Sequence, residues 1–123
     1  MPTVKAILFL KGPQVAAAAP DTTVRQAARR MVGEDVGALI VRDGERMLGI
    51  VTERDFLRSV LAAGKDPDAV TVGEIMSSPV KTCDPSCEAD EAAQIMSDEH
   101  IRHLAVVEGG KLAGIISLRD VQV

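Results

Sequence analysis

The sequence repeats itself at a constant interval of 65 residues. Residues 20–56 align without a gap with residues 85–121, and 12 of the 37 aligned positions are identical. A fixed internal period identifies the structural unit of a chain before any helix or strand is assigned. Two copies are too few for a solenoid, so they must bury their apolar faces as one pseudo-symmetric domain. If the unit carries a binding site, we expect two related sites. The identical pairs are Pro20/Pro85, Ala27/Ala92, Ala28/Ala93, Met31/Met96, Glu34/Glu99, Leu39/Leu104, Val41/Val106, Gly44/Gly109, Gly49/Gly114, Ile50/Ile115, Arg54/Arg119 and Asp55/Asp120.

Composition limits the class of protein. The 123 residues are enough for one domain with a real core, and no apolar run reaches the roughly 18 residues that a membrane span needs. The N-terminus lacks the basic region, apolar stretch and cleavage site of a signal peptide. We therefore expect a soluble cytoplasmic protein with no membrane partner.

Charge and aromatic content argue against nucleic-acid binding. The formal net charge is −4, whereas nucleic-acid binders normally carry a basic face. The chain has no Trp or Tyr and only two Phe, so it lacks a platform on which bases could stack. The same scarcity predicts a core built from aliphatic side chains.

Each copy predicts a helix, a hairpin and a further helix, in that order. The helix has apolar residues at i, i+3, i+4, i+7 and i+8, which place them on one face. The hairpin consists of two short apolar runs joined by a turn that contains Gly44 in the first copy. The apolar stripes are Val24, Ala27, Ala28, Met31 and Val32, and then Ala89, Ala92, Ala93 and Met96; the hairpin runs are 38–41 with 47–51, and 104–107 with 112–116.

Short strands at 15–17 and 80–82 are expected to open the two units. Helical spacing over residues 3–11 predicts an additional N-terminal helix, and 72–76 predicts one helical turn. We divide the chain into an N-terminal helix and lead-in (1–14), repeat 1 (15–64), a linker (65–79) and repeat 2 (80–123). The final helix of repeat 2 is expected to be short or truncated, because the sequence stops three residues after Asp120.

The run Gly-x-x-[Thr/Ser]-x-x-Asp, at the junction of the second strand and the following helix, has its own chemistry. Gly49 lets a ligand or a neighbouring backbone come close to the strand. The Thr52 hydroxyl and the free backbone amides of the helix that starts there point in the same direction, which makes this position a natural anion-binding site. Asp55, one turn on, can accept hydrogen bonds from both hydroxyls of a ribose. Ser117 and Asp120 repeat the arrangement. The alternative interpretation is a structural capping box, and the two roles are compatible.

Taken together, these motifs identify a family resemblance. In order, they are Ala27-Ala-x-x-Met31, Gly49-Ile-Val-Thr-x-x-Asp55, Met76-Ser-Ser-Pro-Val80, Ile101-Arg-His-Leu104 and Gly114-Ile-Ile-Ser-x-x-Asp120. The chain resembles a tandem pair of cystathionine-β-synthase (CBS) domains, called a Bateman module, of the stand-alone bacterial signalling type. The resemblance implies an α/β (α+β) fold of two βαββα repeats packed sheet to sheet, with two clefts between them. It also implies a homodimer that senses AMP, ADP, ATP, NAD or S-adenosylmethionine.

The resemblance further implies that basic residues at the start of the second strand hold phosphate. Arg102 and His103 match this position in repeat 2, whereas repeat 1 has the uncharged Gly37 and Ala38 there. We therefore expect two unlike clefts, with the Asp55 cleft, supplemented by these two residues, better suited to a phosphorylated ligand. The alternatives to a phosphate-binding role are that Arg102 is a solvated surface charge and that His103 is a packed, half-buried side chain.

Other ligand contacts follow from the same resemblance. Arg54 and Arg119 are expected to contact phosphate or to pair with acidic neighbours at the surface. The base would be held by backbone groups and aliphatic side chains, which predicts micromolar affinity. The segments that the family uses for the base are Val15, Ala16 and Ala17, and Val80, Lys81 and Thr82.

Metal and enzyme interpretations are weaker. Cys83, Cys87, His100 and His103 approach the spacing of a zinc finger, but the repeat accounts for the fold without a metal. The two histidines have no matching nucleophile or paired carboxylate, so we expect no enzymatic activity.

The sequence therefore predicts a regulatory sensor of adenosine-containing ligands, with AMP, ATP or NAD foremost and no required cofactor. It would act on an effector protein that the sequence does not identify. The alternative is a structural or dimerisation module whose clefts are degenerate.

Overall fold

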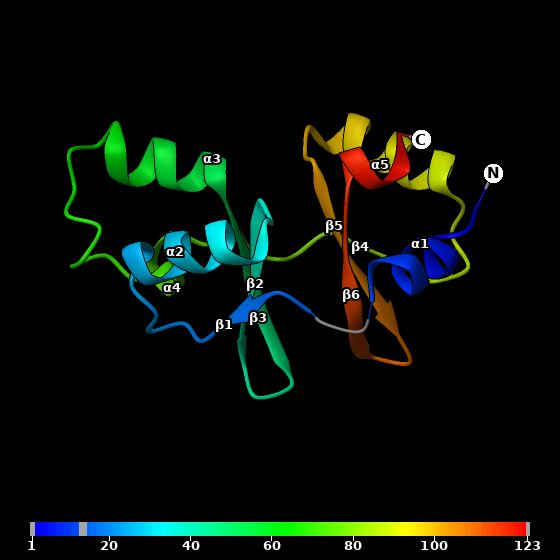
Figure 1. Ribbon diagram of the computed structural model, residues 1–123, viewed down its shortest axis with the longest axis horizontal. Coiled ribbons are helices and arrows are strands. Elements are labelled where there is room, and N and C mark those ends of the chain that lie inside the picture. The colour runs from blue at the N-terminus through cyan, green and yellow to red at the C-terminus, as the bar shows by residue number, and fades with distance from the viewer. Residues whose placement is uncertain (1, 13–14, 123) are drawn as a thin grey trace. The chain divides into compact units, whose positions relative to one another are not determined.

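A computed structural model describes residues 2–12 and 15–122 as an α/β protein with two three-stranded sheets (Figure 1). The chain divides into two compact units. The first-repeat unit is Ala16–Val80, and the second-repeat unit combines Met1–Val15 with Lys81–Val123. Residues 1, 13, 14 and 123 lie outside the described residues, and with them the end of the predicted lead-in 1–14 and of repeat 80–123.

The first-repeat unit is built on the sheet β1-β2-β3. Strand β1 (Ala17–Ala18) runs parallel to β2 (Ala38–Asp43), which forms an antiparallel hairpin with β3 (Arg46–Thr52). The turn between β2 and β3 uses Gly44 at φ +59°, a conformation that favours glycine. Register places Ala38 opposite Thr52, so β2 begins where β3 ends.

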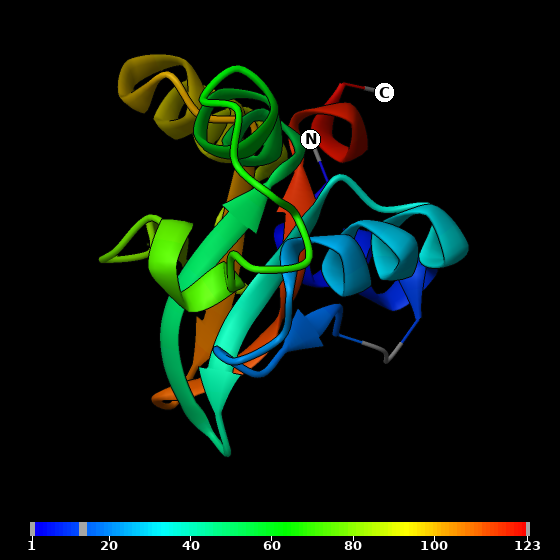
Figure 2. The same cartoon turned by 90° about the vertical axis from the view of Figure 1, so that its left-hand side faces the viewer.

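Helices follow the predicted order in this unit. Helix α2 (Val24–Glu34) starts with a capping box between Thr23 and Gln26. Helix α3 (Glu53–Phe56) continues as the π-helical turn η1 (Leu57–Leu61), and α4 (Val72–Ile75) is a single turn. Figure 2 shows α3 and the hairpin turn at opposite ends of the β2–β3 ladder. The strand-to-helix junction is thus far from the hairpin turn.

The second-repeat unit has the same plan. Its sheet is β4-β5-β6, with β4 parallel to β5 and β5 antiparallel to β6, and α5 precedes the hairpin. His103 lies opposite Ser117, which matches the pairing of Ala38 with Thr52. The elements are β4 (Thr82–Cys83), α5 (Ala89–Glu99), β5 (His103–Glu108), β6 (Lys111–Ser117) and α6 (Leu118–Val121), together with the N-terminal α1 (Val4–Lys11).

Helix α1 belongs to the second repeat, although it lies at the other end of the sequence. Thr3 pairs with Glu88, and the Val4 amide donates to the Cys87 carbonyl at 2.8 Å. In the first-repeat unit, Thr23 pairs with Thr71, the residue just before α4. Because Thr23 and Glu88 are equivalent positions, α1 and α4 are counterparts. Each unit therefore draws a helix from a segment that the 65-residue alignment leaves out.

Both cores are aliphatic, as the composition predicts. Leu39, Val41 and Val51 are fully buried in the first unit, and Leu104, Val106 and Ile116 are their counterparts in the second. The prediction for Val32 is wrong, because its side chain is 84% exposed. Val32 lies at the edge of the apolar stripe, whereas Ala27 and Met31 near its centre are buried.

The strands predicted to open the repeats need a correction. We expected them at 15–17 and 80–82, but the paired residues are Ala17–Ala18 and Thr82–Cys83. The preceding residues Ala16 and Lys81 each contribute only a carbonyl, which accepts a hydrogen bond from the neighbouring strand. The helix predicted over residues 3–11 is confirmed as α1. In the part of the chain that the structure describes, every helix is too short or too polar to cross a bilayer.

Candidate functional site

The candidate ligand residues of each repeat lie toward one end of its sheet. In the first-repeat unit, Ala16 and Ala17 lie beside β2, and Thr52 lies on its other side at the end of β3. Two strand spacings separate these segments, or roughly 10 Å. In the second-repeat unit, Lys81 and Thr82 have the same relation to Ser117. Val15 and Val80 are the residues at which one unit gives way to the other.

Asp55 caps helix α3. Its Oδ2 accepts hydrogen bonds from the Thr52 amide at 2.8 Å and from the Thr52 hydroxyl at 3.2 Å. The Asp55 amide donates to Thr52 Oγ1 at 3.4 Å, which completes a capping box. The structural interpretation of this pair is therefore confirmed. No cation of the described first-repeat residues lies within salt-bridge distance of this half-buried carboxylate.

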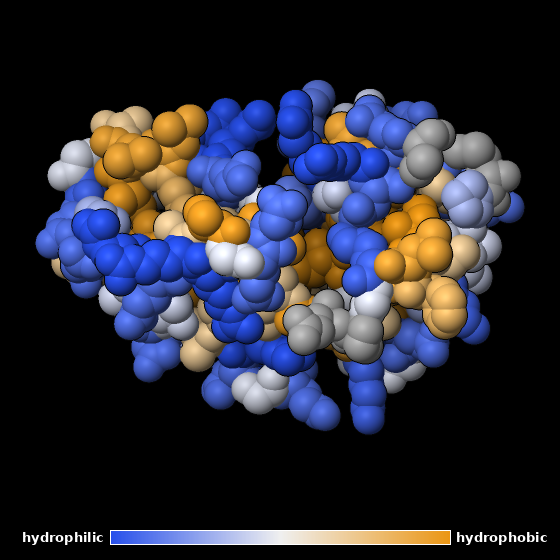
Figure 3. All heavy atoms as spheres, in the orientation of Figure 1, coloured by the Kyte–Doolittle hydropathy of each residue, from blue (hydrophilic) through white to orange (hydrophobic). Residues whose placement is uncertain are grey.

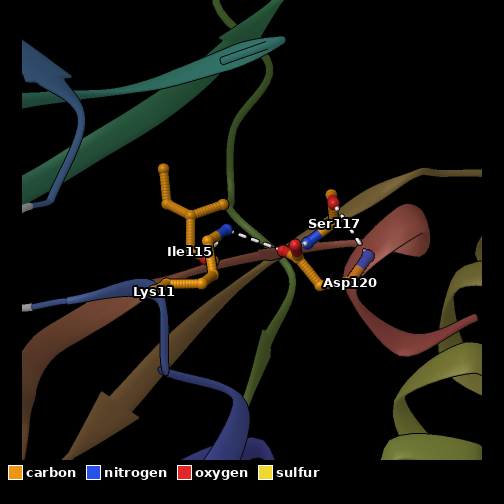
Figure 4. Close-up of polar contacts among 4 residues, drawn as sticks. All are labelled: Lys11, Ile115, Ser117 and Asp120. Carbon is orange, nitrogen blue, oxygen red and sulfur yellow. Dashed lines mark hydrogen bonds and ion pairs between the residues drawn. The ribbon is translucent and has the colours of Figure 1, made fainter. Parts of the chain in front are cut away.

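Asp120 makes the same cap and one further contact. Its Oδ2 accepts from the Ser117 amide at 2.7 Å, and the Asp120 amide donates to Ser117 Oγ at 3.2 Å. The Lys11 ammonium, at the end of α1, donates to Asp120 Oδ2 at 2.6 Å and to the Ile115 carbonyl at 3.1 Å (Figure 4). Burial raises the pKa of Asp120, but the hydrogen bonds and charge of Lys11, with the Ser117 amide, outweigh it and leave that pKa below its usual value.

The candidate arginines reach into solvent. Arg54, Arg102 and Arg119 are exposed, and in residues 2–12 and 15–122 none of them forms an ion pair. The pairing of Arg54 and Arg119 with acidic neighbours, one of the two expectations for them, is thus not seen. The Arg102 carbonyl accepts from the first amide of α6, Leu118 N, at 2.8 Å. The backbone at Arg102 is therefore fixed beside the Ser117–Asp120 cap, while its side chain is available.

His103 and Lys81 lie toward the same end of the sheet as this cap. His103 is half-buried as the first residue of β5, opposite Ser117. The Lys81 ammonium lies 3.7 Å from the Glu99 carboxylate. Asp55 belongs to the first-repeat unit, whereas Arg102 and His103 belong to the second.

The two strand glycines are covered by the chain itself. A Cβ at Gly49 would meet the Met76 side chain at 2.6 Å and the Ser77 carbonyl oxygen at 2.8 Å. A Cβ at Gly114 would meet Leu8 Cδ2 at 2.7 Å. Of the two reasons considered for Gly49, close approach of a neighbouring segment is the one observed.

Lys11 is the residue of the site that sequence reasoning missed. Its partner Asp120 is 109 residues away, and no periodic pattern links the two. A shared pattern was nevertheless present: Thr3-Val4-x-x-Ile7 matches Thr71-Val72-x-x-Ile75. This match has an offset of 68 residues rather than 65, so it falls outside the alignment of the repeats.

The cysteines form a pair of free, half-buried thiols. Burial, followed by the neighbouring Cys87, raises the pKa of Cys83 to about 11, and burial also raises the pKa of Cys87. Within the described residues, no three His, Cys, Asp or Glu side chains gather closely enough to hold a metal ion. The spacing that resembles a zinc finger is therefore not matched by a cluster of ligands.

Known proteins share both the sequence pattern and the fold. A model of the CBS domain matches residues 10–62 and 72–122. The chain is 38% identical over 106 residues to a mitochondrial CBS domain-containing protein of Arabidopsis thaliana, covering 82% of this chain and 52% of that protein. A CBS-domain protein of Agrobacterium tumefaciens superposes with a TM-score of 0.91 at 36% identity, covering 98% of this chain and 96% of that one.

A third relative was solved with a ligand. It is a CBS-domain protein of Pyrobaculum aerophilum complexed with AMP, with a TM-score of 0.84 and 29% identity over 97% of this chain and 89% of that one. The chain spans about half the length of the first curated relatives that it matches. With both repeats matched by the family model and the fold shared with solved CBS pairs, the chain belongs to the CBS-domain family as a tandem pair of CBS domains.

Proposed function

We propose that this CBS pair is a regulatory module that binds an adenine nucleotide. The observation that carries the proposal is the half-buried carboxylate held at the same strand-to-helix junction in both repeats, by Asp55 and Asp120. In each cap only Oδ2 is engaged by the cap itself, which leaves acceptor capacity for a ribose diol. The AMP complex of the Pyrobaculum relative supports this class of ligand.

The rest of the nucleotide would contact backbone and aliphatic groups. The base would lie against Ala16 and Ala17 in repeat 1, or Lys81 and Thr82 in repeat 2, with Val15 and Val80 adjoining. Without an aromatic side chain at these positions, contacts of a few kcal/mol correspond to roughly micromolar affinity. AMP, ATP and NAD are the foremost candidates, with ADP and S-adenosylmethionine after them.

Phosphate recognition is proposed for three exposed arginines and one half-buried histidine. Arg102 and the adjacent His103 would contact a phosphate of the bound nucleotide, and Arg54 and Arg119 would contribute where they adjoin the caps. A phosphate held by an arginine gains strength from paired, charge-assisted hydrogen bonds. Gly37 and Ala38, the equivalent residues of the first repeat, carry no charge and offer no such contact.

Thermal unfolding with and without ligand tests the proposal. A ligand that binds only the folded protein stabilises it by about 2.7 kcal/mol at a concentration 100 times its Kd, so millimolar AMP should raise the Tm by several degrees. The double variant Asp55→Asn, Asp120→Asn is the matched control, because asparagine still accepts the cap hydrogen bond but has no charge. If AMP, ATP, NAD and S-adenosylmethionine all leave the Tm unchanged at millimolar concentration, the sensor function is rejected.

A dimerisation module is the second candidate function. Apolar side chains gather over η1, where Leu57 and Leu61 are 59% and 70% exposed, and over α1 (Figure 3). These two leucines are one helical turn apart, and exposed apolar groups in such a patch favour association. Sedimentation of the wild-type protein should show a homodimer, whether or not nucleotide is present. Regulation would additionally need a second conformer or an effector protein that favours one nucleotide state.

A further inference from the structure

The two carboxylates of the proposed nucleotide sites differ in one way that the repeat does not explain. Asp120 is paired with an ammonium group at 2.6 Å, whereas Asp55 is paired with none in its own unit. The pair is partly shielded, because the Lys11 and Asp120 side chains are 38% and 21% exposed. Both residues are within the second-repeat unit, so the contact is internal to one compact body.

Lys11 satisfies two acceptors at the second site. Its ammonium donates to Asp120 Oδ2 and to the Ile115 carbonyl of β6, and Figure 4 shows the side chain directed at the cap. In the first repeat, the carbonyl equivalent to that of Ile115 is that of Ile50, which accepts the Ser77 amide at 2.9 Å. In repeat 1 a main-chain amide thus donates to the strand carbonyl, and no cationic side chain among that unit's described residues forms an ion pair with the Asp55 carboxylate.

Helix length is the origin of this difference. Helix α4 ends at Ile75, and the chain then leaves the helix so that Ser77 pairs with Ile50. Its counterpart α1 continues for another turn, to Lys11, with Leu8 packed over Gly114. That extra turn, about 5.4 Å of helix, places Lys11 within reach of Asp120.

We propose that Lys11 closes the second site: its ammonium, held at Asp120 Oδ2 and at the Ile115 carbonyl, neutralises the carboxylate and stands where a ribose diol would approach Oδ1, so a nucleotide binds tightly at Asp120 only when Lys11 is displaced. The proposal rests on the proposed nucleotide function and adds a form of regulation to it. The Asp55 carboxylate is then always available to a nucleotide. The Asp120 carboxylate becomes available only to the extent that Lys11, at the end of α1, moves away from it. A partner that binds the Lys11 ammonium, or a modification that neutralises it, would raise the affinity of the second site for nucleotide. The module would then bind nucleotide well at both sites rather than at one.

The test is an AMP titration of ¹⁵N-labelled protein followed by NMR, because amides of the two caps report on the two sites separately. Lys11→Met should make AMP bind more tightly at the Ser117–Asp120 cap, by roughly fivefold, equivalent to the ~1 kcal/mol of a partly exposed ion pair. Affinity at the Thr52–Asp55 cap should stay unchanged. Lys5→Met is the matched control, since Lys5 is exposed on the same helix and has no ion pair within the described residues.

The titrations distinguish failure of the closure from failure of the nucleotide function. Unchanged or weaker AMP binding at the Asp120 cap of Lys11→Met, with normal binding at the Asp55 cap, overturns the closure alone; weaker binding would mean that Lys11 holds the ligand. No AMP binding at either cap in any variant rejects the nucleotide function, and the closure falls with it. A carboxyl titration checks the ion pair without nucleotide: Lys11→Met should raise the pKa of Asp120, and an unchanged value would overturn the contact on which the closure depends.

Discussion

Gly49 and Gly114 are equivalent residues with different neighbours. At Gly49, an added Cβ would meet the Ser77 carbonyl oxygen at 2.8 Å as well as the Met76 side chain, whereas at Gly114 it would meet only the end of the Leu8 side chain. A flexible side chain can rotate away, but a paired backbone carbonyl cannot move without breaking the bridge between Ile50 and Ser77. The first glycine is therefore the more constrained of the two.

We expect Gly49→Ala to lower the free energy of unfolding by about 1–3 kcal/mol, and Gly114→Ala to lower it by less than about 1 kcal/mol. Gly33→Ala is the control, because a Cβ there meets nothing within 4 Å and Gly33 is in helix α2, so the variant should gain about 0.5 kcal/mol. Urea unfolding measures all three. Equal losses at Gly49 and Gly114 would contradict the role of the Ser77 carbonyl.

Cys83 offers a prediction that depends on pH. Burial and then Cys87 raise its pKa to about 11, so at pH 8 the thiolate fraction should be on the order of 200-fold lower than that of an unfolded cysteine with pKa ≈ 8.5. Alkylation by iodoacetamide, located by peptide mass spectrometry, should therefore be slow at pH 8 and accelerate up to about pH 11. The protein unfolded in guanidinium is the control and should react quickly already at pH 8.

The same shift has a consequence for stability. Between the unfolded pKa near 8.5 and the folded value of about 11, the unfolded state loses the Cys83 proton while the folded state keeps it. The free energy of unfolding should therefore fall as pH rises through this window, and the fall should be smaller in Cys83→Ala. A stability that rises with pH in this range and depends on Cys83 would reverse the sign of the assigned shift.

At the scale of elements, α1 and α4 complete the two cores from outside the repeat. Val4 and Val72 are both fully buried, each in the cluster of its own unit. Local periodicity predicts both helices, because each has apolar residues one turn apart. It does not predict which sheet a helix covers, since that depends on hydrogen bonds between residues 85–89 and the start of α1, which are remote in sequence.

Truncation of these valines should destabilise one unit each. Val4→Ala and Val72→Ala should each cost about 1–3 kcal/mol, as expected when buried methyl groups are removed from a packed core. Native-state hydrogen exchange should locate the loss: β5 and β6 for Val4→Ala, β2 and β3 for Val72→Ala. Loss of protection in β2 and β3 for Val4→Ala would contradict the assignment of α1 to the second repeat.

For the whole molecule, the repeat predicts the fold and the caps but not the state of each site. The spacing of Thr52 and Asp55 fixes a local capping box, because all of its atoms lie within one helical turn. The partner of Asp120 depends on the length of a helix 109 residues earlier, so it follows only from the folded structure. The predicted inequality of the two sites therefore gains a second cause, besides Arg102 and His103.

The two sites should differ in how much nucleotide affinity depends on their carboxylates. Asp55→Asn should weaken AMP binding by tenfold or more, because hydrogen bonds to a charged acceptor contribute about 1.5–3 kcal/mol. Asp120→Asn should weaken the tightest binding by less than about threefold, since Lys11 already holds that carboxylate. Both asparagines can keep the helix cap, so the comparison isolates the charge. Isothermal titration calorimetry measures both variants, and a larger loss in Asp120→Asn would mean that the site paired with Lys11 is the principal one.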